Sequence, residues 1–380
     1  MNAPNISGHV SPGFEGVRRA VLENMAERDE LGCQVAIFRH GEPLVDLCAG
    51  WADRKTTKAV TPDTLFSVYS SGKAMAALVV ARLVEVGALD YDAPVSELWP
   101  EFAAHGKGAV TLAQMMSHQS GLSGITDPGF QPEDWLDFDR VASTLAAQAP
   151  IFPPGSQSGY HPVTFGFLAG EMARRADPAG RRLGLQLRDE LAVPAGADVH
   201  IGLDASDHAR VAQMIKPRQM ADLGTITDAT RAAFLQPWSS PARISAEDWR
   251  EAEMAGSNCQ ATARGIAVLM QAFVDGKVAG RTVLSESTRE AATRSRIKGQ
   301  DAVLPFVIDF AAGVMRNDPN YYYGPKPDTL GHSGWGGSAV FADPETGLHG
   351  AYVMNRQAHY LMGDPRANAV ISAAFESLRQ

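Results

Sequence analysis

Two side chains of complementary chemistry lie three positions apart, at Ser70 and Lys73. On a helix, positions i and i+3 share one face, so this hydroxyl and this amine can meet. A serine hydroxyl is a weak nucleophile until a neighbouring base removes its proton, and a lysine in dry surroundings can have its pKa lowered enough to serve. The N–H groups at the start of a helix also favour developing negative charge. The pair therefore indicates a serine nucleophile.

The surrounding sequence separates this pair from a second copy of the same spacing, at Ser295 and Lys298. The second copy lies in a polar stretch with no apolar helix after it, so we interpret it as a solvated surface segment. Ser70 instead precedes the apolar stretch 74–86, which predicts a central buried helix. A motif this short is only a hypothesis without its structural context, and the alternative is that Ser70 caps a core helix.

Tyr160 is a second candidate for proton transfer. The sequence Pro153-Pro154-Gly155 predicts a turn before it, and a helical pattern follows it. A phenol, whose ordinary pKa is about 10, acts as a base only where cations hold it as phenolate. Lys73 would supply that cation and share a proton with the phenol. The alternative is a tyrosine of the core or of an interface.

A glycine-rich segment, Leu330–Gly337, leads into a predicted strand and contains His332, Ser333, Gly334 and Trp335. Glycine lets a backbone approach a ligand closely. A strand beside the nucleophile would donate a backbone N–H to an oxyanion. The alternative is an ordinary turn that enters a β-hairpin.

Strand and helix patterns that would position these residues lie in different parts of the chain. Residues 14–29 have helical spacing of apolar side chains, and two apolar runs around His40-Gly41 predict a β-hairpin. The C-terminal third returns to the composition of strands. Further helices are predicted at 133–148, 163–175, 183–192, 260–275 and 367–378, and strands within 303–315, 336–343 and 349–356.

These patterns predict an α+β fold, in which one antiparallel sheet assembled from both chain ends is flanked by helices, together with a second, mainly helical domain. We place the α/β domain at residues 1–88 and 240–380 and the helical domain at residues 89–239. A cleft where the two domains meet is the expected place for a site.

The composition excludes several classes of function. The chain has 380 residues, is 45% apolar and carries a net charge of -9, so it has no basic surface for nucleic acid or anionic membrane. The three cysteines are Cys33, Cys48 and Cys259, without a CxxC pair, and no metal-binding motif such as HExxH is present. We therefore expect no cofactor and no metal, and we expect a cytoplasmic protein because neither a secretory leader nor a membrane-spanning stretch is visible.

The motifs, in this order, resemble those of the serine β-lactamase and penicillin-binding superfamily. FSVYSSGK, at 66–73, is similar to the Phe-x-x-x-Ser-x-x-Lys of the class C branch. AQMMSHQSGL, at 113–122, resembles its Leu-Leu-x-His-x-x-Gly-Leu segment, and the stretch 331–355 resembles its Gly-His-x-Gly closing strands. The resemblance extends from about Gly13 to Leu378.

Within that branch, the chain resembles the family VIII carboxylesterases, which cleave esters on the β-lactamase fold. The hallmarks are Tyr160 followed by His161, and Trp335-Gly336-Gly337. The resemblance implies that Ser70 is the nucleophile, that Lys73 and Tyr160 transfer protons, and that the backbone N–H groups of Ser70 and Trp335 form an oxyanion hole. Residues implied to bind a small ester substrate are His161, His332, Ser333, Gly334, Trp335, Gly336 and Asn258.

Two departures from the class C pattern argue against a β-lactam or D-Ala-D-Ala substrate. Pro162 stands where those enzymes keep an asparagine that binds the side-chain amide of the lactam. His332 stands where they keep a lysine, and a histidine is mostly uncharged at neutral pH. The resemblance therefore implies a carboxylesterase that acts on short-chain esters through an acyl-serine intermediate.

Other functions remain open from the sequence. The same acyl-serine chemistry suits a β-lactamase, a D-amino-acid peptidase or an amidase, and a binding protein without catalytic activity can retain the fold. An α/β-hydrolase is disfavoured, because Trp335 stands where a nucleophile elbow begun by Gly331 and Ser333 needs glycine. We expect His118 to order a loop, and the roles of Asn258 and Arg264, and the oligomeric state, are open.

Overall fold

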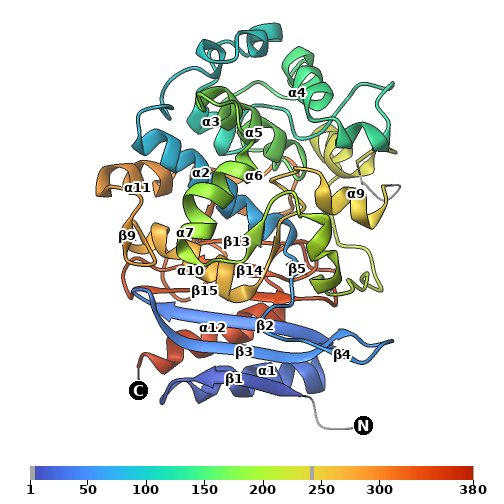
Figure 1. Cartoon of the computed structure of the whole chain (residues 1–380). Coiled ribbons are helices and arrows are strands. Elements are labelled where there is room, and N and C mark those ends of the chain that lie inside the picture. The colour runs from blue at the N-terminus through green and yellow to red at the C-terminus, as the bar shows by residue number, and fades with distance from the viewer. Residues whose placement is uncertain (1–4, 240–243, 380) are drawn as a thin grey trace.

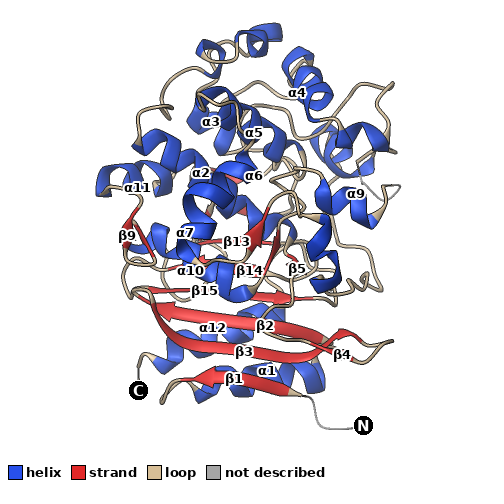
Figure 2. Cartoon of the chain, viewed as in Figure 1, coloured by secondary structure: helices blue, strands red, loops and turns tan. Residues whose placement is uncertain are grey.

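The computed structural model describes residues 5–239 and 244–379, and a large antiparallel sheet runs through its lower half in Figures 1 and 2. The strand order is β1-β3-β2-β15-β14-β13-β12-β11-β10, and every neighbouring pair is antiparallel. The N-terminal strands are β1 (Ile6–Val10), β2 (Gly32–Arg39) and β3 (Glu42–Asp53), with the short β4 (Lys58–Ala59) beside β3. The C-terminal strands are β10 (Ile297–Gln300), β11 (Val307–Phe310), β12 (Met315–Arg316), β13 (Leu330–Ser333), β14 (Ala339–Ala342) and β15 (Leu348–Met354).

The two chain ends meet where β2 pairs with β15, with Val35 opposite Tyr352. The predicted hairpin is confirmed: β2 and β3 turn at His40 and Gly41, whose φ angles are +48° and +85°. Side chains on β2 alternate between two cores, because successive residues of a strand point to opposite faces. Val35 packs into one apolar cluster and the next residue, Ala36, packs into the other. This burial on both sides explains why the strand is apolar on both faces.

Helices cover both faces of the sheet, as Figure 1 shows. The first and last helices, α1 (Glu15–Glu27) and α12 (Pro365–Ser377), pack together on one face, which confirms the predicted N-terminal helix. Helix α10 (Ala263–Asp275) packs on β15, β2 and β14 from the other face. Helix α2 (Lys73–Glu85) lies deeper in the same core, since nearly all its side chains are buried. The predicted α+β fold with one sheet built from both ends is thus confirmed.

A mainly helical part lies above the sheet in Figure 1. The predicted helix at 133–148 is broken into a 3₁₀ segment, Pro132–Leu136, and α4, because Asp137 adopts an extended backbone and its carboxylate caps the Arg140 N–H at 3.0 Å. The helices here are α3 (Leu112–Met116), α4 (Phe138–Ala147), α5 (Thr164–Ala176), α6 (Leu183–Gln186), α7 (Val193–Ala195), α8 (Asp228–Thr230) and α9 (Ala246–Glu251), and α11 (Glu286–Thr293) follows α10.

The division into two domains stays a prediction, and its boundary at residue 240 falls outside the described residues. The helical part contributes a strand of its own, because β6 (Val199–His200) pairs with β7 (Gln260–Ala261), which in turn pairs with β5 (Phe66–Ser67). A small two-stranded sheet, β8 (Lys277–Val278) with β9 (Arg281–Thr282), follows α10. No helix in the described parts of the chain is long and apolar enough to cross a membrane.

The second Ser-x-x-Lys copy, interpreted from the sequence as a surface segment, runs into the edge strand β10, which contains Lys298 but not Ser295. The two residues therefore do not share a helical turn, and the i, i+3 argument does not apply to them. Ser295 instead donates to Asp309 at 2.5 Å, and Lys298 pairs with Asp318. The segment is a strand as well as a surface, which the polar sequence did not reveal.

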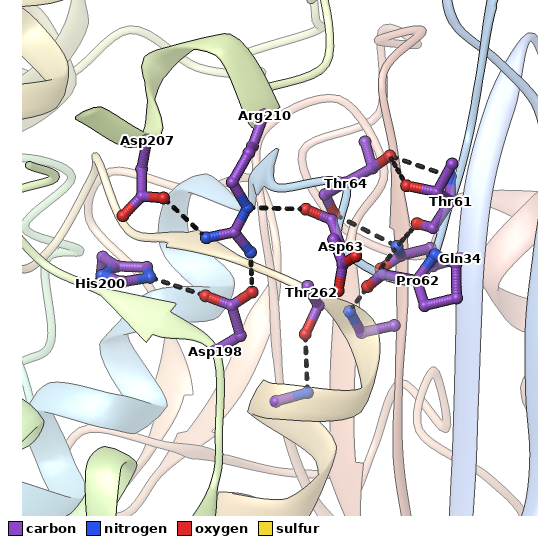
Figure 3. Close-up of polar contacts among 12 residues, drawn as sticks. Gln34, Thr61, Pro62, Asp63, Thr64, Asp198, His200, Asp207, Arg210 and Thr262 are labelled. Carbon is purple, nitrogen blue, oxygen red and sulfur yellow. Dashed lines mark hydrogen bonds and ion pairs between the residues drawn. The ribbon is translucent and has the colours of Figure 1, made fainter. Parts of the chain in front are cut away.

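A buried glutamine fixes the chain just before the nucleophile (Figure 3). The Gln34 side-chain amide on β2 donates to the carbonyl oxygens of Thr61 at 2.6 Å and Thr64 at 3.2 Å. Its oxygen accepts from the Ala263 N–H, at the start of α10, at 2.9 Å. One side chain thus joins the sheet, the helix on its face and the loop that leads into β5.

A second set of contacts holds the same loop from the other side (Figure 3). Arg210 donates to the carbonyl oxygen of Asp63 at 3.1 Å and pairs with Asp207 and Asp198. Asp198 also contacts His200 at 2.7 Å, on β6. Because β6 and β5 both pair with β7, these contacts tie the helical part to the strand that precedes the Ser70 turn.

We predict that Gln34→Ala lowers the free energy of unfolding by about 2 to 4 kcal/mol, because it leaves the buried Thr64 carbonyl and the buried Ala263 N–H without this partner. Thermal or urea unfolding measures the loss. Gln213→Ala, which changes an exposed side chain, is the control and should alter stability by no more than about 0.5 kcal/mol. Equal stability of the two variants would contradict the role given to Gln34.

Candidate active site

The nucleophile candidate lies on a tight turn at the head of a buried helix. Ser70 is partly exposed within the 3₁₀ turn Tyr69–Gly72, which runs directly into α2. Tyr69 has a φ of +48°, a left-handed conformation that is rare for a bulky residue and costs energy. Gly72 is required at this turn, since a Cβ there would lie 2.3 Å from the Cβ of Cys259. The turn is therefore fixed by packing rather than by its own preference.

Lys73 meets Ser70 as the i, i+3 spacing predicts, with 2.9 Å between Nζ and Oγ. The amine is fully buried and has two further neighbours, the carbonyl oxygens of Pro162 at 2.8 Å and Gly256 at 2.6 Å. Burial lowers the pKa of Lys73 well below its ordinary value, because desolvation disfavours the charged form. A neutral amine has two N–H groups and one lone pair, so two carbonyls and one hydroxyl match its bonding capacity.

Tyr160 completes the group. Its ring centroid lies 4.8 Å from Nζ of Lys73, and its backbone N–H donates to Asp301 at 3.0 Å. Burial raises the pKa of the Tyr160 phenol above its usual range, while a hydrogen bond with the Ser70 hydroxyl acts in the opposite direction. The structure thus brings the three predicted side chains together, and burial favours the neutral form of both the amine and the phenol.

The end of β13 lies against the nucleophile turn. A Cβ on Gly334 would lie 2.2 Å from the carbonyl oxygen of Val68, so only glycine permits this approach. Ser338 donates to that same carbonyl at 2.8 Å, and its hydroxyl lies 3.0 Å from that of Ser71. The N–H of Trp335, a partly exposed residue, donates no hydrogen bond to any residue in the described parts of the chain. Gly334 therefore lies beside the Ser70 turn, and Trp335 follows it directly in the chain.

His332 is buried next to this group. Its ring centroid is 6.1 Å from that of Tyr160, and Nδ1 lies 2.9 Å from the Ser333 carbonyl oxygen. Burial, with the nearby Lys73, lowers the pKa of His332 to about 3, so the ring is neutral at physiological pH. The Ser333 hydroxyl forms a hydrogen bond with the phenol of Tyr323, at 3.0 Å.

Two predicted substrate-binding residues turn inward instead. His161 is fully buried, with Nε2 at 2.8 Å from the Ser120 hydroxyl and Nδ1 at 2.5 Å from the Gly159 carbonyl. The side chain of Asn258 is occupied by the backbone of its own loop: it donates to Trp249 at 2.6 Å and accepts from Met254 at 3.1 Å. The structure thus places both as framework for the site rather than on a surface that faces a ligand.

His118 has the loop-ordering position expected of it. It has a φ of +62°, and its Nδ1 accepts from the His161 N–H at 3.2 Å. Its ring packs against that of Tyr160, with 4.9 Å between the ring centroids. Arg264 pairs with Asp46 at 2.7 Å on the surface of β3, away from this group.

Sequence reasoning missed the groups that hold the amine and the phenol. Gly256 and Pro162 act through carbonyl oxygens, which every residue has, so no residue type signals them. Asp301 accepts from the N–H groups of Tyr160, Val303 and Leu304 and so fixes the turn opposite the phenol. A lone aspartate in a polar stretch gives no sequence signal for this role.

A family model described as Beta-lactamase matches residues 17–374. The chain belongs to the beta-lactamase family. It is 34% identical over 370 residues to the esterase/beta-lactamase LipL of Mycobacterium tuberculosis, with 92% of this chain and 83% of that protein aligned. It is 35% identical over 150 residues to the esterase EstB of Burkholderia gladioli, covering 35% of this chain and 38% of that one.

Solved structures agree with the family assignment. A penicillin-binding protein homologue from Caulobacter crescentus matches with a TM-score of 0.95 and 48% identity, over 98% of this chain and 100% of that one. A family VIII carboxylesterase matches with a TM-score of 0.92 and 38% identity, over the same shares of the two chains. The resemblance predicted from the motifs is confirmed, and this beta-lactamase family member is a hydrolase of the esterase/beta-lactamase fold.

We predict that Gly334→Ala reduces the rate of ester hydrolysis by about 100-fold. The added Cβ would push the segment away from the nucleophile turn, and a displacement of about 1 Å in an active site can lower the rate by about that factor. Initial rates on a p-nitrophenyl ester measure the effect. Gly299→Ala, where a Cβ meets nothing within 4 Å, is the matched control. A Gly334→Ala variant as active as the control would contradict the close approach.

Proposed function

We propose that the chain is a serine carboxylesterase that hydrolyses short-chain esters through an acyl-serine intermediate. The observation that carries the proposal is the 2.9 Å contact between Ser70 Oγ and the buried amine of Lys73. The two remaining contacts of that amine go to carbonyl oxygens, which can only accept. A neutral amine with its two N–H groups on these carbonyls keeps its lone pair for the Ser70 hydroxyl, which also lies 3.3 Å from the Gly256 carbonyl oxygen. We assign the amine as the base that takes the Ser70 proton when the substrate is bound.

In the first step, Ser70 Oγ attacks the ester carbonyl carbon and its proton moves to Lys73 Nζ. The carbonyl π electrons move to the oxygen, and the N–H groups of Ser70 and Trp335 stabilise this oxyanion. Such a donor contributes roughly 3 to 4 kcal/mol, judging from deletions in other enzymes. When the tetrahedral intermediate collapses, the bond to the alcohol breaks. Tyr160 donates its phenolic proton to the leaving alkoxide and is reprotonated from Lys73.

Water then reverses these roles. It attacks the acyl carbon as one of its protons moves to Lys73 Nζ, and a second oxyanion forms in the same place. Collapse breaks the bond to Ser70 Oγ, which takes that proton back from Lys73, and the carboxylic acid leaves. One water is consumed, and one alcohol and one acid are produced. The enzyme ends in the protonation state in which it began.

The neighbours of Tyr160 favour an ester over a β-lactam. Pro162 has no N–H and offers only a carbonyl, which Lys73 already occupies. His332 is neutral at physiological pH, so it supplies no fixed cation for a lactam carboxylate. The names of the relative EstB and of the family VIII carboxylesterase structure point the same way.

A β-lactamase side activity is the second candidate, because LipL is named for both activities and the acyl-serine chemistry is shared. We expect kcat/KM for p-nitrophenyl butyrate to exceed that for nitrocefin by at least about 100-fold. The reason is that the site offers no cation at His332 to bind the carboxylate of the lactam. Steady-state kinetics on both substrates decides the order. A higher value for nitrocefin would reverse the assignment.

We predict that Ser70→Ala abolishes hydrolysis of p-nitrophenyl butyrate, with a loss of at least about 10⁴-fold, because no nucleophile remains. A fluorophosphonate probe should label the wild-type chain once and leave this variant unlabelled. Ser295→Ala removes the serine of the second Ser-x-x-Lys copy and serves as the control, with labelling and rate unchanged. Labelling that persists in Ser70→Ala would reject the nucleophile.

The pH dependence follows from the two pKa directions. Lys73 must be free of its proton to act, and burial lowers its pKa, so kcat/KM should rise with pH through a limb well below 10.5 and then level off. Tyr160 must keep its proton, and burial raises its pKa, so the plateau should persist to at least about pH 10. A rate that rises only near the ordinary lysine pKa, after subtraction of buffer hydrolysis, would contradict this assignment.

A further inference from the structure

The loop that carries the Trp335 N–H is held from outside itself. The Gly336 carbonyl oxygen accepts two hydrogen bonds, from the Ala358 N–H at 2.9 Å and from Nη2 of Arg366 at 3.0 Å. The Trp335 carbonyl lies 3.4 Å from the side-chain amide of Gln357. Gly336 and Gly337 have φ angles of +88° and +129° and no side chains that could restrain the loop. Within the loop, the Gly337 N–H donates to the Gly334 carbonyl at 3.1 Å, which closes a turn around Trp335 and Gly336. The outside donors fix how this turn is oriented against the rest of the fold.

Arg366, the donor with a charge, lies in the first turn of α12 and its side chain is only 4% exposed. Its Nε and Nη2 contact Asp364 at 3.0 and 2.7 Å, and its Nη1 contacts the Arg356 carbonyl at 2.8 Å and Glu30 at 3.5 Å. The guanidinium is thus fixed on three sides before it reaches Gly336. A planar group with five donors that is held in this way fixes the position of the carbonyl that it binds. Hydrogen bonds from a charged donor are also stronger than those between neutral groups.

The loop also lies in direct contact with this ion pair. A Cβ on Gly337 would lie 2.3 Å from Oδ2 of Asp364 and 2.7 Å from Nη2 of Arg366. Glycine is therefore needed at 337 for two reasons, the positive φ and the presence of the pair. No substrate atom would have to touch Arg366 for it to act, because it acts on the loop.

We propose that Arg366 is a positioning residue that sets the direction of the Trp335 N–H and so completes the oxyanion hole; this inference rests on the proposed function. Bonds from Arg366 and Ala358 to its carbonyl, together with the bond from its own N–H to Gly334, fix the plane of the Gly336–Gly337 peptide. The two residues that precede it are then restrained between that anchor and the contact of Gly334 with Val68. The last helix of the chain thereby determines the geometry of a donor that belongs to the loop between β13 and β14.

The test compares Arg366→Lys and Arg366→Met with Glu30→Gln. Lysine keeps a cation between Glu30 and Asp364 but lacks the planar guanidinium whose Nη2 donates to the Gly336 carbonyl. Methionine removes every donor. Glu30→Gln weakens the same buried cluster on its far side and leaves the bond to Gly336, so it is the matched control. Rates on p-nitrophenyl butyrate are divided by the number of sites that a fluorophosphonate titrates to completion, which removes the effect of misfolded protein.

We expect Arg366→Lys to lower kcat by about 10- to 100-fold while KM stays within about threefold, since the loss falls on the transition state. The Ki of an alkylboronic acid, which adds to Ser70 and forms a tetrahedral anion, should rise by a similar factor. Glu30→Gln should lower the melting temperature but keep both values.

The proposal is overturned if Arg366→Lys keeps kcat and boronate affinity per titrated site while only its melting temperature falls. If Arg366→Met yields no folded protein, Arg366→Lys decides alone. Failure of the proposed function would look different: the wild-type chain itself would not hydrolyse the ester and would not be labelled at Ser70.

Discussion

A fully buried lysine amine, for which the described residues offer no carboxylate partner, is the constraint on which the site depends. Because no anion among those residues offsets the desolvation of its charged form, burial lowers the pKa of Lys73 well below the ordinary value, as the proposed role of a base requires. The carbonyls of Pro162 and Gly256 satisfy its two N–H groups and leave the lone pair for Ser70. An acidic neighbour would have made an ion pair and abolished this chemistry.

The fold meets this constraint by drawing on distant parts of the chain. The apolar helix α2 supplies the dry surroundings, the helical part supplies Tyr160 and Pro162, and the segment before β7 supplies Gly256. The sheet, closed by β2 against β15, brings β13 beside the nucleophile turn. Stabilisation elsewhere offsets the left-handed backbone of Tyr69, and strain at such a position is common where function demands it.

The candidate site residues could be predicted from the sequence where their residue type and their spacing along the chain gave a signal. Ser70, Lys73 and Tyr160 have such signals, and so does the glycine turn at Gly334, because each needs its own side chain or the lack of one. The sequence also predicted the sheet built from both ends. It did not reveal that His161 and Asn258 face inward, since burial depends on tertiary packing. Carbonyl acceptors and the bond from Arg366 leave no sequence pattern at all.

The protonation state of Lys73 is the most direct test of the account. Solution NMR of the lysine side chains, with the Lys73 signal assigned by comparison with Lys73→Arg, reports the titration of its amine as the pH is changed. We expect the Lys73 amine to titrate with a midpoint well below 10.5 and well below the midpoints of the exposed lysines. A Lys73 amine that remains protonated up to about pH 10, as an ordinary lysine does, would contradict it.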